Sequence, residues 1–149
     1  MHKVGELEAK KLMRKRFIKA DVDDDIKKVI KTFLNTDANV IAVFDRRKFV
    51  GEIHELDLLK LAVNPKEIPE EEIVVLGFGM DMGYFAKTAR DIVRRHDVSI
   101  SPETKIKDAS FIMLKENVKS LPVMKKDKLL GILTEKDILK KVIDRGKKK

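Results

Sequence analysis

The sequence predicts an α/β fold, or α+β in some classifications, made of two similar halves. The expected elements run helix, strand, helix, strand, strand, helix, and the same order begins again near Tyr84. When the chain is slid by 80 residues, 9–62 align with 89–142 without a gap, and twelve of 54 pairs are identical. A unit of about 55 residues has little core of its own, so we expect the copies to pack sheet to sheet around a pseudo-twofold axis.

Each element follows from local periodicity and from the residues that bound it. In the first copy we expect a helix at 6–15, a strand at 17–20, a helix to about Asn35, strands at 40–44 and 49–53 joined by a somewhat longer loop, and a helix over 56–62. The chain then divides into a first repeat (1–63), an inter-repeat segment (64–83), a second repeat (84–146) and a basic tail (147–149).

Composition excludes several classes of protein. No cysteine is present, and His2, His54 and His96 are not spaced as a ligand pair, so we expect no metal site. No run approaches the roughly 20 apolar residues that a membrane span needs, and the N-terminus lacks a signal-peptide core, so we expect a cytoplasmic protein. A charged fraction of 39% resembles the ion-pair-rich composition of thermophile proteins.

The net charge of +8 is concentrated at the two ends of the chain. Residues 1–20 and 136–149 each carry a net charge of +5. Basic ends could attract nucleic acid or another anionic partner, although solvated termini explain the same charges.

The segment between the copies, 63–87, is unique sequence. Its apolar stretch contains Gly77, Gly79 and Gly83, and we expect it to pack on the module or in a dimer interface. Its glycines fail the dinucleotide-binding fingerprint, which needs a third glycine where Met82 stands.

The motif that carries chemistry is a strand that turns directly into a helix. It reads GILTEKDIL at 131–139 and GEIHELDLL at 51–59. Thr134 and Asp137 have the spacing of a helix capping box, which needs no ligand. In the first copy the cap position is His54, a poor cap, yet Asp57 is retained, so capping alone explains the shared acid incompletely.

Together with the duplication, Ser120-Leu121-Pro122-Val123 and Gly131-Ile132-Leu133-Thr134-x-x-Asp137 resemble a tandem pair of CBS domains, the Bateman module. The first copy departs from the pattern, with Ile41-Ala42-Val43 in place of Leu-Pro-Val and His54 in place of Thr.

The resemblance implies that the helix-start acids bind the ribose of an adenosine-containing ligand such as AMP, ADP, ATP or S-adenosylmethionine. A carboxylate suits a cis-diol because it accepts two hydrogen bonds side by side. One implied site combines Asp137 and Thr134 with an adenine slot from Ile18, Lys19, Ala20, Asn39, Val40 and Ile41. The other combines Asp57 and His54 with Val98, Ser99, Lys119, Ser120, Leu121 and Pro122. Lys119 and Lys19 are the expected phosphate contacts.

These features predict a non-catalytic regulatory module, with no catalytic residues and no catalytic cofactor, that signals to a separate and unknown partner protein. We expect a homodimer that pairs through the helices at 5–15 and 84–95. The alternative is a nucleic-acid-binding or protein-interaction module that uses the basic termini.

Overall fold

The computed structural model describes residues 2–72, 83–95 and 98–147, and the chain forms two compact units. Unit 1 comprises Met1–Phe17 and Asp97–Lys149, and unit 2 comprises Ile18–His96. The units are defined by packing, whereas the predicted repeats were defined by sequence likeness. The two divisions differ because residues 1–17 pack with the second half of the chain.

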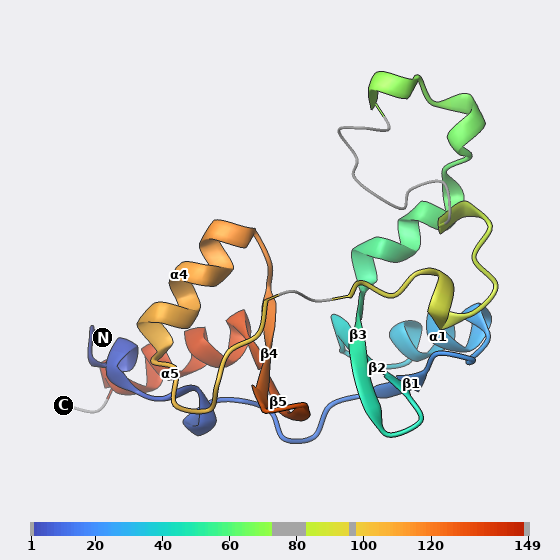
Figure 1. Cartoon of the computed structure of the whole chain (residues 1–149). Coiled ribbons are helices and arrows are strands. Elements are labelled where there is room, and N and C mark those ends of the chain that lie inside the picture. Colours follow the sequence, from blue (N-terminus) through green and yellow to red (C-terminus); the bar gives the residue numbers. More distant parts are fainter. Residues whose placement is uncertain (1, 73–82, 96–97, 148–149) are drawn as a thin grey trace. The chain divides into compact units, whose positions relative to one another are not determined.

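Unit 2 is built on a three-stranded sheet in the order β1-β2-β3 (Figure 1). Strand β1 pairs in parallel with β2, and β2 pairs antiparallel with β3. The bounds are β1 Lys19–Asp21, α1 Ile26–Leu34, β2 Val40–Asp45, β3 Lys48–His54 and the 3₁₀ helices η3 Glu55–Ala62, η4 Pro65–Glu67 and η5 Ala89–Asp91. Asp25 caps α1 by accepting a hydrogen bond from the Lys27 amide at 2.8 Å, which satisfies one of the free amide groups at the helix start.

Unit 1 repeats this arrangement around the antiparallel hairpin β4-β5. Its bounds are η1 His2–Glu6, η2 Ala9–Lys11, α4 Ile106–Glu116, β4 Ser120–Lys125, β5 Lys128–Thr134 and α5 Glu135–Lys147. Ile100 makes an isolated parallel bridge to Val123, in the place that β1 takes in unit 2. The elements confirm the predicted α/β class and hairpins.

The duplication extends to backbone details. Both hairpins shift register at matching positions, between Val43 and Phe44 and between Val123 and Met124. Both turn through a residue with positive φ, 62° at Arg46 and 56° at Lys126. The predicted longer loop is therefore wrong, because the left-handed residue lets the chain reverse within two residues.

Each unit includes a short segment, which we call its arm, that crosses the last strand of the unit. The arm of unit 1 is residues 2–17, and that of unit 2 is residues 83–95. Arg14 exchanges two backbone hydrogen bonds with Ile132 on β5, at 2.8 and 3.0 Å, and Arg94 does the same with Glu52 on β3, also at 2.8 and 3.0 Å. In place of the predicted helices at 6–15 and 84–95 the arms contain short 3₁₀ turns, because backbone groups of the arms form hydrogen bonds with the strands.

A glycine marks the crossing point in each unit. A Cβ atom on Gly131 would lie 2.7 Å from the carbonyl oxygen of Arg14, and one on Gly51 would lie closer still to that of Arg94. Glycine is required at both positions because the arm backbone occupies the space of a side chain.

Each unit has its own apolar core. Buried residues of the arm and of the main helix meet the strands in both, and the arm contributes the fully buried Ala9 in unit 1 and Ala89 in unit 2. The last apolar residue of each main helix lies outside these cores, since Leu34 of α1 is 77% exposed and Leu114 of α4 is 81% exposed. The second part of the inter-repeat segment, 73–82, and the tail residues 148–149 lie outside the described residues, so the expectation that 73–82 pack on the module stays a prediction.

Candidate ligand-binding site

In unit 1 the turn from β5 into α5 brings a carboxylate, two hydroxyls and a guanidinium together. Thr134 donates from Oγ1 to Asp137 Oδ2 at 2.7 Å, and the Asp137 amide donates to Thr134 Oγ1 at 3.3 Å. Arg14 Nε lies 3.1 Å from Asp137 Oδ1 and 2.9 Å from Oδ2. The predicted pair of Thr134 and Asp137 is therefore assembled, with Arg14 as a third member.

Ser120 lies beside this cluster. It is paired with Thr134 in the β4-β5 register, so both side chains project from the same face of the hairpin. Ser120 is buried, and its hydroxyl finds no hydrogen-bond partner among the residues that the structure describes. A buried hydroxyl without a partner is costly, so a polar group supplied by a ligand would be stabilised here.

In unit 2 the equivalent acid is enclosed. Arg94 Nε lies 2.8 Å from both oxygens of Asp57, and Arg94 NH2 lies 2.6 Å from Oδ1. The His54 amide donates to Oδ2 at 3.1 Å, and Lys60 Nζ lies 3.8 Å from Oδ1. The Asp57 side chain is 1% exposed, against 15% for Asp137.

A second buried carboxylate stands next to His54. Glu52 is fully buried on β3, and His54 Nε2 lies 3.2 Å from Glu52 Oε1. Unit 1 has Ile132 and Thr134 at the equivalent positions, so the two units place different chemistry beside the shared acid.

The remaining predicted site residues fall into two groups. Those assigned to the slot of Asp137 all lie in unit 2: Ile18, Lys19, Ala20, Asn39, Val40 and Ile41. Those assigned to the slot of Asp57 all lie in unit 1: Val98, Ser99, Lys119, Ser120, Leu121 and Pro122. Val40, Ile41, Leu121 and Pro122 are buried strand residues. Each described unit holds only part of each set, so the slots stay predictions.

The two expected phosphate contacts are exposed lysines. Lys19 Nζ lies 5.4 Å from the centre of the Phe44 ring, a cation–π contact within unit 2. The Lys119 carbonyl accepts a hydrogen bond from the Glu135 amide at 2.9 Å, and the Asn39 carbonyl accepts one from Glu55 at 3.0 Å in the other unit. These matching bonds tie each hairpin to the helix that carries its acid.

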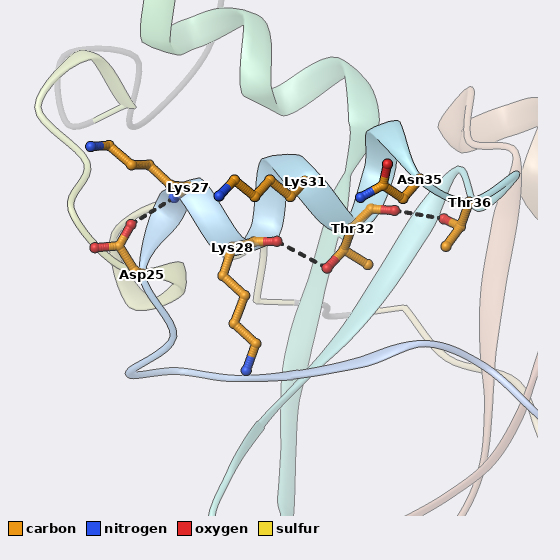
Figure 2. A pocket seen from close by; sticks show the side chains of 7 residues that line it. All are labelled: Asp25, Lys27, Lys28, Lys31, Thr32, Asn35 and Thr36. Carbon is orange, nitrogen blue, oxygen red and sulfur yellow. Dashed lines mark hydrogen bonds between the residues drawn. The ribbon is translucent and has the colours of Figure 1, made fainter.

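A hollow of about 580 Å³ in unit 2 lies along α1, and Asp57 does not line it. Figure 2 shows its lining, which includes Lys27, Lys28 and Lys31, and the bond from Thr32 to the Lys28 carbonyl. None of the predicted site residues lines it. Its lysines are exposed side chains of one helix, so it offers a basic surface and no enclosed site.

Across the described part of the chain, no three His, Cys, Asp or Glu side chains gather closely enough to bind a metal ion. Within the same residues, no helix has both the length and the apolar character needed to cross a membrane.

The duplicated turn, with its acid and its arm, is matched by a known family. The family model of the CBS domain matches residues 5–64 and again 89–144. The chain belongs to the CBS domain family. The resemblance of the motifs at 120–123 and 131–137 is thereby confirmed.

CBS relatives occur among curated proteins. The chain is 28% identical to the uncharacterized protein MJ1426 of Methanocaldococcus jannaschii, covering 93% of this chain and 94% of that one. It is 44% identical over 52 residues to the inosine-5′-monophosphate dehydrogenase of Thermoplasma acidophilum, covering 35% of this chain and 11% of the enzyme.

Solved CBS structures share the fold at low sequence identity. CBSX2 in complex with AMP has a TM-score of 0.78 at 18% identity and covers 92% of this chain and 97% of its own. The CBS domain pair of protein MJ0100, in complex with 5′-methylthioadenosine and S-adenosylmethionine, has a TM-score of 0.70 at 20% identity and covers 91% and 99%.

Sequence reasoning missed the two arginines that contact Asp137 and Asp57. The signal was present, because Arg14 and Arg94 are one of the twelve identical pairs of the duplication. It was not interpreted, since the contact of each arginine with its acid joins parts of the chain that are 123 and 37 residues apart, and local periodicity does not reveal such a contact. Glu52 was missed because a charged residue in the middle of a strand resembles an exposed position.

Proposed function

We propose that this CBS-domain protein is a non-catalytic regulatory module that binds an adenosine-containing ligand, such as AMP, ADP, ATP or S-adenosylmethionine, through the ribose. Asp137 accepts the two ribose hydroxyls, and Thr134 holds the carboxylate in place by its 2.7 Å hydrogen bond. Binding then changes the geometry presented to a separate partner protein.

The observation that carries the proposal is the polar cluster at the start of α5. Asp137 receives only Arg14 Nε and Thr134 Oγ1 from the described side chains, so its two oxygens retain acceptor capacity. The unpartnered hydroxyl of Ser120 lies on the neighbouring strand. The AMP and S-adenosylmethionine complexes of proteins with the same fold support the ligand class.

We also propose that the protein forms a homodimer through α4 and α5. The helices expected to form the interface at 5–15 and 84–95 are short turns that bury Ala9 and Ala89 in the cores, although Phe85 is 59% exposed, so that surface stays a prediction. In unit 1, Phe111 and Leu114 on α4 are exposed, as are Leu139 and Ile143 on α5. Each pair is spaced three or four residues apart and lies on one helical face, and such apolar faces mark interaction surfaces.

Isothermal titration calorimetry on nucleotide-stripped protein tests the ligand proposal. AMP, ATP and S-adenosylmethionine are titrated separately up to about 1 mM, which corresponds to weak but measurable binding. We expect at least one to bind, and Asp137→Asn to weaken it about tenfold or more. Asp144→Asn, an exposed acid on the same helix, is the matched control. If none of the three binds, the sensing function is wrong.

A further inference from the structure

The two units contain equivalent aspartates, but the side chain is more exposed in unit 1 than in unit 2. Asp137 and Asp57 are equivalent in the duplication, and each follows its strand by three residues. Their side chains are nevertheless 15% and 1% exposed. Asp57 lies on the 3₁₀ helix η3 and Asp137 on the α-helix α5, and the groups around the two carboxylates also differ.

The carboxylate of Asp57 has little acceptor capacity left. Its two oxygens are contacted by Arg94 through Nε and NH2, by the His54 amide and, at 3.8 Å, by the Lys60 ammonium. A carboxylate offers about four lone-pair sites, and four donor groups surround this one. A ribose diol could bind only if Arg94 moved away.

The carboxylate of Asp137 carries fewer donors. Arg14 donates to it through Nε, and Thr134 Oγ1 donates the one other side-chain hydrogen bond that it receives from the described residues. The residue on the adjacent strand also differs, because unit 1 has Ser120 where unit 2 has Val40. Unit 1 therefore combines an accessible acid with two hydroxyls, and unit 2 combines an enclosed acid with a valine.

We propose that Asp137 alone accepts the ligand and that Arg94 is the specificity-determining residue, because it occupies the carboxylate of Asp57 and so prevents Asp57 from binding the ribose. The inference rests on the proposed function and adds which acid is used. Displacing Arg94 would leave a carboxylate of 1% exposure without its main counter-charge, and this should make the Asp57 site weaker by about 100-fold or more. Arg14 needs no such displacement, because a bridging Nε leaves a lone pair on each oxygen.

The first experiment compares five proteins, the natural chain and four variants, by calorimetry with AMP and, separately, with S-adenosylmethionine. We expect one site per chain in the natural protein, unchanged affinity in Asp57→Asn, and binding weaker by about tenfold or more in Asp137→Asn. Arg94→Lys keeps the charge but cannot contact both oxygens in the same way, and we expect it to add a weaker second site. Arg14→Lys is the matched control and should add none.

The second experiment follows the arginine Nε–H resonances by nitrogen-15 NMR during the AMP titration. The Arg14 signal should shift because its carboxylate is shared with the ribose, whereas the Arg94 signal should stay in place. This readout needs no variant, so it holds even if Arg94→Lys unfolds.

The outcomes separate the two proposals. Two equal sites in the natural protein, or loss of binding in Asp57→Asn with binding retained in Asp137→Asn, would overturn the role of Arg94 while leaving nucleotide binding intact. If neither AMP nor S-adenosylmethionine binds, the proposed function is overturned, and this inference with it.

Discussion

Arg94 and Asp57 form an ion pair in which the carboxylate is buried and the arginine side chain is 41% exposed, and its shortest contact, from Nη2 to Oδ1, is 2.6 Å. The equivalent pair of Arg14 and Asp137 is longer, at 2.9 Å from Nε to Oδ2, and its carboxylate is more exposed, whereas its arginine is similarly exposed at 44%. The duplicated interaction therefore differs between the two units in the burial of the acid and little in that of the arginine.

Substitution of Arg94 by Met should destabilise unit 2 by about 3–5 kcal/mol, because it leaves the Asp57 charge buried and without its partner. Arg14→Met should cost only about 1 kcal/mol, since Asp137 remains partly solvated and bonded to Thr134. Urea unfolding followed by circular dichroism measures both. The double variant Arg94→Met with Asp57→Asn should recover most of the loss, and equal costs for the two single variants would contradict the difference in burial.

The glycines at the arm crossings should tolerate no side chain. Gly51→Ala should cost about 3 kcal/mol and Gly131→Ala somewhat less, because the added Cβ meets the carbonyl oxygen of Arg94 more closely than that of Arg14. Gly5→Ala is the control, since its Cβ would lie 3.1 Å from Lys107 Cβ and no closer than 3.8 Å to the Lys107 backbone. Thermal unfolding ranks the three, and a Gly51→Ala variant as stable as Gly5→Ala would refute the close crossing.

The arm of unit 2 should lose part of its stability in acid. Asp91 accepts backbone hydrogen bonds from Lys87 at 2.8 Å and from Thr88 at 3.1 Å, and these bonds hold the pKa of its carboxyl below the ordinary value. The contribution is complete above the unfolded pKa of about 3.9 and is lost as the pH falls through the folded value.

Melting temperatures of the natural protein and of Asp91→Asn between pH 7 and pH 2 test this dependence. The variant should be less stable by about 1 kcal/mol at neutral pH, because a neutral amide oxygen is a weaker acceptor. The difference should close below pH 4. A gap that stays constant down to pH 2 would show that the carboxylate charge is not the cause.

Substitution of Leu114 by Lys should weaken the proposed homodimer about tenfold or more, because it places a charge on an apolar helical face. Sedimentation equilibrium measures the dissociation constant. Lys115→Gln, an exposed neighbour on the same helix, should leave it unchanged. A natural protein that is monomeric throughout the accessible concentration range would refute the interface.

The strands and the two main helices were predictable because their signals are local. Val40–Phe44 is a continuous apolar run, Val29 and Phe33 have helical spacing, and the structure buries most of these residues. The capping pair of Thr134 and Asp137 was predictable for the same reason. The tight turns at Arg46 and Lys126 were not, since neither residue type favours a positive φ.

The arms could not be derived from the sequence in the same way. Leu7, Leu12 and Met13 have approximately helical spacing, but the strand beside them satisfies the backbone of Arg14 instead. Which part of the chain an arm joins depends on contacts distant in sequence, and local propensity yields to tertiary contacts of that kind. For the same reason, the different states of Asp57 and Asp137 could not be predicted from two motifs that both end in the same acid.

The arms also impose an order of assembly. Asp57 and Arg94 are separated by 37 residues, whereas Arg14 and Asp137 are separated by 123. During synthesis, unit 2 can close as soon as its own residues emerge, while the first arm must wait for β5 and α5. We expect pulsed hydrogen exchange to show protection of the Glu52 amide before that of Ile132, and the reverse order would contradict this. Of the two acids, the one proposed to bind ligand would then be completed second, so a nascent chain would acquire its sensing capacity only after α5 has been made.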